Sequence, residues 1–191
     1  MARGIIIIGV AGSGKTTLGK LLADKLKYKY IDIDEYIWHQ DTVIPFSKMY
    51  SKEEKIINLN NAIKDTDYFV MAGSMYSIHE HFDDLFELTI FLTCNKEIRI
   101  ARLQKREKER FGNRVEAGGD MYEEHINFIN YVSNYETGMD GSNLAQHKKW
   151  LSELKCPIIT LDGANSLDDN LNEIIKAYKK IKLIKNDNII I

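Results

Sequence analysis

The apolar positions of this chain fall into five short runs, separated by longer segments with helical periodicity. The runs cover residues 4–9, 30–34, 68–73, 88–93 and 156–163. Helical patterns cover 15–26, 52–65, 78–87, the arginine-rich 99–114, 121–136, 144–154 and 167–183. Short, continuous apolar strands that alternate with helices are typical of a parallel sheet covered on both faces. We therefore predict an α/β fold with a five-stranded parallel sheet and helices on both faces.

No repeat or low-complexity linker divides the 191 residues. The pattern predicts a single domain over 1–191, with an acceptor-binding insertion at about 35–65 and a lid at about 107–122. Glycines at 112, 118 and 119 flank or lie in the lid segment and give it backbone freedom. The role of the stretch 185–191 stays open at this point.

Composition restricts the classes of partner. With hydrophobic residues at 44%, the chain can bury a substantial core. A formal net charge of -2 gives no general attraction to nucleic acid or to an anionic membrane. The apolar runs are too short to cross a bilayer, and the two cysteines lack metal-ligand spacing. We expect a cytoplasmic protein, monomer or homodimer, with neither nucleic acid nor membrane as partner.

The segment GVAGSGKT, residues 9–16, lies between the first strand and the first helix and fits the phosphate-loop pattern G-x-x-x-x-G-K-[ST]. In such a loop, backbone N–H groups and the helix start hold phosphate oxygens, and Lys15 reaches the β- and γ-phosphates. We therefore expect ATP, with Lys15 as a catalytic residue. The predicted nucleotide-binding residues of this segment are Gly9, Ala11, Gly12, Ser13, Gly14, Lys15, Thr16 and Thr17.

Two carboxylates, Asp32 and Asp34, end the second apolar run. The period of two in a strand places both on one face at the carboxyl edge of the sheet, where ligands of open α/β folds bind. We expect Asp32, together with Thr16, to hold Mg²⁺, and Asp34 to orient or deprotonate the attacking hydroxyl. Ordinary acids at a strand end remain the alternative. The third apolar run ends at Gly73, is followed by Ser74 and supplies no Walker B acid.

Five of the six arginines lie within residues 99–114, at positions 99, 102, 106, 110 and 114. Like charges four residues apart on a helix repel each other, so the spacing calls for compensation by acidic neighbours or by an external anion. A solvated helix face and a phosphate-binding face are both compatible with this pattern. The phosphate loop on the same chain favours the second.

The motif GVAGSGKTT, an Asp-x-Asp about sixteen residues after the Lys-Thr pair, and ARLQKR after the fourth strand give the chain a resemblance to the small P-loop kinases. This group contains the shikimate, gluconate and nucleoside monophosphate kinases. The resemblance implies a three-layer P-loop NTPase fold with an adenylate kinase-type lid. It places Arg102 against the adenine and Arg106, as a catalytic residue, against the phosphates. It also implies adenine contacts at Gly163 and Asn165.

The acceptor half of the site departs from the family patterns. Nucleoside monophosphate kinases bind the acceptor phosphate with arginines between the first and fourth strands, and this chain has only lysines there. The arginine of shikimate kinases after strand three is also missing, and His79, Glu80 and His81 make a poor zinc site. Aromatic and hydroxyl groups take these places and favour an uncharged or weakly charged acceptor. Our predicted substrate-binding residues are Asp34, Trp38, Ser74, Tyr76 and Arg114.

The sequence therefore predicts a magnesium- and ATP-dependent kinase that phosphorylates a hydroxyl of a small metabolite. A nucleoside monophosphate kinase and a nucleotide-binding regulatory ATPase are the alternatives. The identity of the acceptor is not readable from the sequence.

Overall fold

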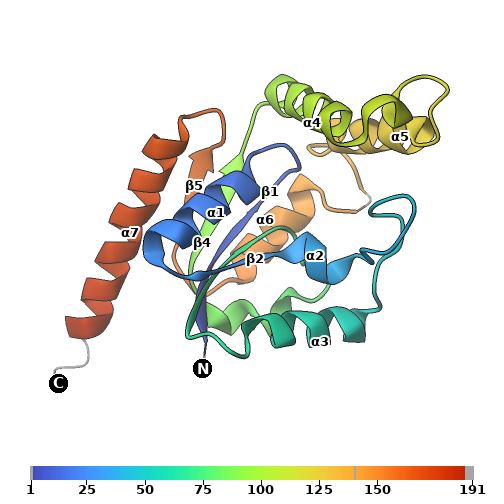
Figure 1. The fold of residues 1–191 in the computed structure, drawn as a ribbon. Helices are drawn as coiled ribbons and strands as arrows, with labels where there is room; N and C mark the ends of the chain where they lie inside the picture. Colours follow the sequence, from blue (N-terminus) through green and yellow to red (C-terminus); the bar gives the residue numbers. More distant parts are fainter. Residues whose placement is uncertain (1, 140, 188–191) are drawn as a thin grey trace.

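The computed structural model describes residues 2–139 and 141–187 and shows a five-stranded sheet with helices on both faces (Figure 1). The strands are β1 (Arg3–Gly9), β2 (Lys29–Asp32), β3 (Tyr68–Ala72), β4 (Phe86–Thr93) and β5 (Ile158–Asp162). They pair in the order β2-β3-β1-β4-β5, and every pair is parallel. This topology confirms the predicted fold class.

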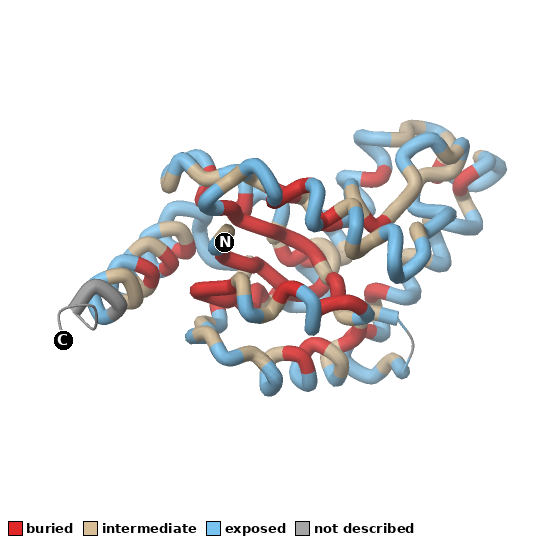
Figure 2. Tube along the Cα trace, turned by 90° about the horizontal axis from the view of Figure 1, so that it is seen from below, coloured by how far each residue is buried: buried red, intermediate tan, exposed pale blue. Residues whose placement is uncertain are grey.

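The central strand β1 is buried because both of its faces are covered (Figure 2). Ile5 and Ile7 pack into one hydrophobic cluster, while Ile6 and Ile8 pack into another on the opposite face. All four side chains are fully buried. A parallel strand between two helical layers needs apolar residues at every position, and this explains the unbroken isoleucine run in the sequence.

The helices form two layers over the sheet and a separate group beyond its carboxyl edge (Figure 1). They are α1 (Lys15–Leu26), α2 (Ile33–Ile37), α3 (Lys52–Ile63), α4 (Lys96–Phe111), α5 (Tyr122–Ser133), α6 (Leu144–Glu153) and α7 (Leu167–Asp187). Helices α1 and α7 share one core cluster with the sheet, and α3 and α6 share the other. Helices α4 and α5 pack together through a third, smaller cluster that includes Val10 of the phosphate loop.

The C-terminal helix continues past the predicted end at 183 and is described to Asp187. Of the stretch 185–191, whose role the sequence left open, residues 188–191 lie outside the described residues. No helix in the described part of the chain combines the length and the apolar character that crossing a bilayer requires.

The predicted helix at 78–87 is wrong. The structure has two short 3₁₀ turns, His79–His81 and Asp83–Leu85, and β4 begins already at Phe86. The backbone bonds of this segment run three residues back, as in Phe82 N–H to the His79 carbonyl at 2.8 Å. Phe82 is completely buried, so its packing against the sheet, rather than helical periodicity, sets the path of the chain.

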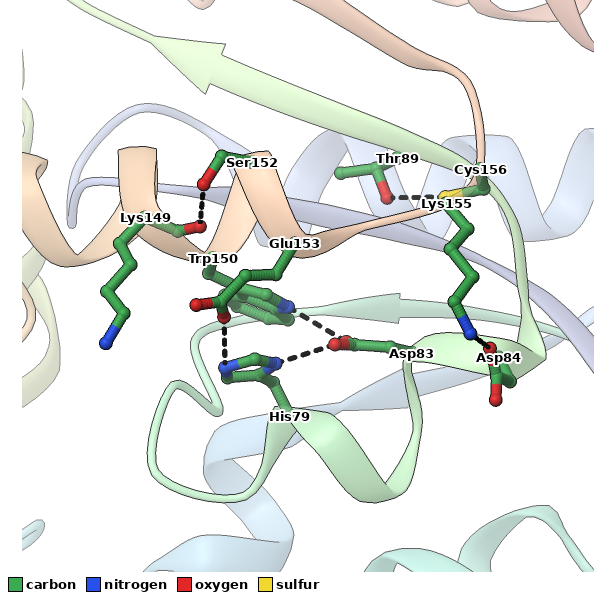
Figure 3. A network of polar contacts seen from close by, with 10 residues as sticks. All are labelled: His79, Asp83, Asp84, Thr89, Lys149, Trp150, Ser152, Glu153, Lys155 and Cys156. Carbon is green, nitrogen blue, oxygen red and sulfur yellow. Dashed lines mark hydrogen bonds and ion pairs between the residues drawn. The ribbon is translucent and has the colours of Figure 1, made fainter.

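A polar network fixes this connection to the C-terminal part of α6 (Figure 3). The His79 ring contacts the Asp83 carboxylate at 2.7 Å through Nδ1 and the Glu153 carboxylate at 3.3 Å through Nε2. It also stacks on the fully buried Trp150, whose indole N–H donates to Asp83 at 2.9 Å. His79 therefore has a structural role, and the described residues contain no group of three or more His, Cys, Asp or Glu side chains that could hold a metal ion.

Candidate active site

The phosphate loop connects β1 to α1 through three glycines with positive φ angles. These angles are 149° at Gly9, 81° at Gly12 and 103° at Gly14. A Cβ atom at Gly9 would lie 2.1 Å from the Leu92 carbonyl oxygen, and one at Gly12 would lie 2.6 Å from the Arg99 carbonyl oxygen. Only glycine satisfies both the backbone angles and the space at these two positions. The loop can therefore wrap closely around an anion at the start of α1.

Two side chains of the loop fit a bound phosphate. The Ser13 hydroxyl is completely buried and has no hydrogen-bond partner among the described residues. A buried polar group without a partner costs free energy, and a phosphate oxygen in the cradle would supply one. Lys15 is half-buried and donates to the Val10 carbonyl at 2.9 Å, so its ammonium group lies over the loop. The unpaired hydroxyl and the glycine cradle thus fit the phosphates of a nucleotide.

Burial lowers the pKa of Lys15 from 10.5 to about 8, and the positive charge of Arg106 acts in the same direction. The carboxylates of Asp34 and Asp32 oppose this shift. Four charged side chains predicted from separate parts of the sequence thus lie close enough to influence one another. The two cations and the two carboxylates balance each other in charge.

Asp32 and Asp34 both lie at the carboxyl edge of the sheet, but not on one strand as predicted. Strand β2 ends at Asp32, and Asp34 belongs to the first turn of α2. The Asp32 side chain accepts the Asp34 backbone N–H at 3.3 Å and thereby acts as the N-cap of α2. This local bond competes with strand geometry and explains why the period-two expectation fails here.

The pKa of Asp34 is raised, chiefly because the surrounding protein removes water from the carboxylate, with a further contribution from the negative charge of Asp32. Lys15 and Arg106 act in the opposite direction. Asp34 nevertheless keeps solvent-exposed surface, so a second molecule can reach it. A carboxylate that is accessible and more basic than usual is suited to accept a hydrogen bond or a proton.

The residues predicted to hold Mg²⁺ offer oxygen donors. The Thr16 hydroxyl donates to the Asp32 carboxylate at 3.5 Å, and the Tyr30 hydroxyl donates to the same oxygen at 3.3 Å. Mg²⁺ usually binds one or two carboxylates together with phosphates and water, so Thr16 and Asp32 fit this ion when a nucleotide is bound. Met71 and Ala72 at the end of β3 are buried and apolar, which confirms that no acid stands at the Walker B position.

A pocket of about 180 Å³ lies beside the phosphate loop. The Arg102 guanidinium donates to the Gly163 carbonyl at 2.9 Å and thereby connects α4 to the loop after β5. The pocket brings together residues from four segments: Ser13, Gly14, Thr17, Leu18, Leu92, Arg102, Gly163, Asn165, Leu167 and Asn170. It therefore contains the residues that the family resemblance assigned to the adenine. Their contact with adenine stays a prediction.

The five clustered arginines have different surroundings. Arg99 is buried, and it donates to the Cys94 and Val132 carbonyls and pairs with Glu136 at 2.7 Å. Its guanidinium group also lies 5.6 Å from the Tyr135 ring centroid. Arg99 therefore belongs neither to a solvated face nor to a phosphate-binding face, since it ties α4 to the segment after α5.

Arg106 is the clustered arginine that faces the phosphate loop. It influences the pKa of both Lys15 and Asp34, and it pairs with the buried Glu107 at 2.9 Å. About half of its side chain remains exposed, at 52%. Its contact with a bound phosphoryl group stays a prediction, and Glu107 compensates its charge in the free protein.

Arg110 and Arg114 contact the 38–50 segment, which belongs to the predicted acceptor-binding insertion. Arg110 lies over the Phe46 ring at 5.3 Å, and Arg114 donates to the Val43 carbonyl at 3.3 Å. Arg114 also pairs with Asp120, and these bonds raise the pKa of Arg114 and lower that of Asp120. The predicted lid segment thus already touches the insertion, and the charge of Arg114 is compensated within the chain.

The other predicted acceptor residues lie apart from one another. Trp38 packs edge to face on Phe46 at 6.0 Å within the insertion. The Tyr76 ring centroid lies 5.6 Å from that of His79, which belongs to the structural network of Figure 3. Ser74, in contrast, follows the end of β3 and contacts His147 of α6 at 3.3 Å.

Sequence reasoning missed His147 together with Tyr135 and Ser142. His147 is completely buried, and its ring contacts the Tyr135 hydroxyl at 2.7 Å and the Ser142 hydroxyl at 2.9 Å. Burial lowers the pKa of His147 to about 4, and the charge of Lys15 contributes to this shift. The histidine therefore lies near the phosphate loop. No short motif marks it, because its partners come from distant parts of the chain.

Comparison with known proteins identifies the family of the chain. Residues 5–126 match the family described as AAA domain. The chain belongs to this AAA domain family. The matched region includes the phosphate loop, Asp32, Asp34 and the arginine helix. Membership implies nucleotide binding.

The relatives of this AAA domain chain include an uncharacterized protein and two kinases. It is 29% identical over 176 residues to the uncharacterized protein YqaC of Bacillus subtilis (strain 168), covering 92% of this chain and 97% of that protein. It is 27% identical over 192 residues to a cytidylate kinase of Sulfurisphaera tokodaii, covering 95% and 98%. It is 35% identical over 107 residues to a shikimate kinase of Staphylococcus aureus (strain JH9), covering 52% and 62%. The chain is thus distantly related to small-molecule kinases.

Solved structures show the same fold. A shikimate kinase from Bacteroides thetaiotaomicron superposes with a TM-score of 0.57 at 18% identity, covering 93% of this chain and 98% of that one. A gluconokinase from Sinorhizobium meliloti 1021 gives a TM-score of 0.55 at 14% identity, covering 97% of both chains. At these identities the likeness concerns the fold alone.

Proposed function

We propose that the protein is a kinase that transfers the γ-phosphoryl group of ATP to a hydroxyl of a small metabolite. The observation that carries this proposal is the electrostatic group formed by Lys15, Asp34 and Arg106. Each of the two shifted pKa values, that of Lys15 and that of Asp34, depends on the other residue and on Arg106. A base next to two cations at the edge of a phosphate loop suits phosphoryl transfer to a second molecule better than nucleotide binding alone.

The chain's own residues account for the transfer. The loop amides and Lys15 hold the β- and γ-phosphates, and Arg106 leaves Glu107 to meet the charge that develops on the transferred group. Asp34 accepts the proton of the attacking hydroxyl, which becomes the bridging oxygen of the product as the bond to ADP breaks. Bound at Thr16 and Asp32, Mg²⁺ would neutralise phosphate charge. The lid and the insertion exclude water that would otherwise hydrolyse ATP.

A screen of acceptors tests the proposal. ADP release is measured with ATP and Mg²⁺ in the presence of sugars, sugar acids, shikimate, nucleosides, aminoglycosides or nucleoside monophosphates. We expect at least one hydroxyl compound to increase the rate well above hydrolysis alone. ATP hydrolysis at a rate that no small molecule changes would refute the kinase proposal and would favour a nucleotide-binding regulatory ATPase.

The role of Asp34 is tested by Asp34→Asn, with Asp24→Asn on the exposed surface of α1 as the matched control. We expect Asp34→Asn to reduce kcat about a hundredfold or more, as for the loss of a general base, while calorimetry shows unchanged ATP binding. Asp24→Asn should match the wild-type protein in both measurements. An unchanged kcat for Asp34→Asn would remove the role assigned to this residue.

A nucleoside monophosphate kinase is the second candidate. The similarity to the cytidylate kinase, which extends over 95% of this chain, favours it. The pairing of Arg114 with Asp120 argues against it, because that guanidinium is not free to bind an acceptor phosphate in the described state. Stimulation of ADP release by nucleoside monophosphates alone would reverse the order of the two candidates.

A further inference from the structure

A chain of four polar side chains lies at the carboxyl edge of the sheet beside the phosphate site. The Tyr135 hydroxyl contacts Nδ1 of His147 at 2.7 Å, and Nε2 of His147 contacts the Ser142 hydroxyl at 2.9 Å. The Ser142 hydroxyl donates to the Ser74 hydroxyl at 3.2 Å. Tyr135 and His147 are buried, whereas Ser142 and Ser74 are only partly covered. The chain therefore leads from the protein interior to an accessible hydroxyl.

The protonation states of Tyr135 and His147 determine which group donates and which accepts along these four side chains. Burial lowers the pKa of His147 to about 4, so the ring is neutral at pH 7 and has one donor and one acceptor nitrogen. Burial also raises the pKa of Tyr135, so its hydroxyl keeps the proton. Nδ1 of His147 is the partner found for that hydroxyl among the described residues. Tyr135 therefore donates to Nδ1, and the ring proton lies on Nε2.

With these donor and acceptor roles, the described contacts of Ser74 do not use its hydroxyl hydrogen. Nε2–H of His147 donates to the serine oxygens, and Ser142 passes its own hydrogen to the Ser74 oxygen. Both described contacts of the Ser74 oxygen are then accepted bonds. Its hydrogen remains available for an oxygen atom of a bound molecule.

Ser74 and Asp34 follow adjacent strands at the same edge of the sheet. The register pairs Asp32 of β2 with Ala72 of β3, so Asp34 and Ser74 each lie two residues beyond paired positions on adjacent strands. A Cβ atom at the intervening Gly73 would lie 2.7 Å from Cβ of Ile33, which shows how closely the two segments pack. Strands β2 and β3 are adjacent, so the segments that carry Asp34 and Ser74 leave the sheet side by side at its carboxyl edge.

We propose that Tyr135, His147, Ser142 and Ser74 position the phosphoryl acceptor, with Ser74 donating a hydrogen bond to a second oxygen of the molecule whose reacting hydroxyl lies at Asp34. The proposal rests on the proposed kinase function. The acceptor class is a small uncharged polyhydroxy compound, because the chain of side chains carries no charge and Arg114 is paired with Asp120. Ser74 contacts the substrate, and His147 and Tyr135 are positioning residues that act through it.

The direction of the chain can be measured without any acceptor. In protein with ¹⁵N-labelled histidine, a long-range ¹H–¹⁵N correlation spectrum at pH 7 should show His147 neutral with its proton on Nε2, assigned by loss of the signals in His147→Gln. Tyr135→Phe removes the hydrogen bond to Nδ1 and should change the Nδ1 shift. A proton on Nδ1 or a charged ring in the wild-type protein would overturn the proposal.

Acceptor kinetics test the consequence, with ribose, glucose and myo-inositol as uncharged probes and shikimate, gluconate and cytidine monophosphate as charged ones. For the best uncharged acceptor, Ser74→Ala should raise the acceptor KM about tenfold, or about 1.4 kcal/mol, and leave the KM for ATP unchanged. Tyr135→Phe should raise the acceptor KM less, about threefold. Tyr28→Phe, which removes a tyrosine hydroxyl bond to Tyr178 away from the site, should change neither constant.

The outcomes separate this inference from the function on which it rests. An acceptor that is phosphorylated with the same KM by wild-type and Ser74→Ala protein overturns the role of Ser74 and leaves the kinase proposal intact. Phosphorylation of charged acceptors alone overturns the acceptor class. If no compound increases ADP release in the wild-type protein, the kinase proposal fails and the inference fails with it.

Discussion

Replacing Lys15 by methionine should raise the free energy of unfolding of the nucleotide-free protein above that of the wild type. This gain should be larger at neutral pH than at high pH. Burial lowers the pKa of Lys15 from 10.5 to about 8, so the folded protein holds this proton less tightly than the unfolded chain does. Between these two pKa values the unfolded state binds more protons, and the stability of the wild-type protein therefore rises with pH. Lys15→Met has no such group, so its stability lacks this contribution.

The size of the effect follows from the two pKa values. At pH 7 the lysine is charged in both states, and the lowered pKa costs about 3 kcal/mol of folding free energy. At about pH 9.5 the folded protein has lost the proton, and the remaining cost is about 1 kcal/mol. From pH 7 to about pH 9.5, the difference between the free energies of unfolding of wild type and Lys15→Met should thus change by about 2 kcal/mol in favour of the wild type. Contributions of the lost bond to Val10 cancel in this comparison.

Urea unfolding at the two pH values measures the change. Both proteins contain all other titratable groups, so the difference between their free energies of unfolding reports Lys15 together with its effect on the neighbouring Asp34. Lys25→Met, at an exposed position of the same helix, gives the reference. Parallel pH dependence of wild type and Lys15→Met would refute the reasoning, because it would mean that the loop does not desolvate the ammonium group.

Two further predictions concern the arginine cluster. Arg99→Met should lower the free energy of unfolding by about 3 kcal/mol, because it leaves the Glu136 carboxylate and two carbonyls without their buried partner. Urea titrations measure this change, and a loss below about 1 kcal/mol would contradict the role of Arg99. Arg102→Ala should raise the KM for ATP about tenfold and leave kcat nearly unchanged, since Arg102 lines the pocket beside the phosphate loop and does not face the transferred group. A fall of kcat at unchanged KM in steady-state kinetics would argue against that placement.

Most of the fold could be predicted because continuous apolar runs mark strands that are covered on both faces. The prediction failed where local side-chain bonds decide the geometry. Asp32 caps α2 and ends β2 two residues early, and the buried Phe82 draws 78–87 into turns. Neither event changes the hydrophobic pattern, so neither was visible in it.

The phosphate half of the candidate site was readable because its residues are contiguous and their chemistry depends on local backbone geometry. The other half depends on contacts across long separations. Ser74 and His147 are 73 positions apart, and Arg99 and Glu136 are 37 positions apart. In the sequence, His147 is one polar residue of a helix, and Arg99 is one arginine among five. The sheet and the helix packing bring each pair together.

Helix α6 carries residues of both networks described above. Trp150 and Glu153 contact the two 3₁₀ turns before β4 (Figure 3), while His147, three residues before Trp150, contacts Ser74 after β3. A rigid helix held at one end transmits a tilt to its other end. Under the proposed function, exchanges of residues that pack on Trp150 and Glu153 could therefore change how the acceptor fits, although these residues do not touch it.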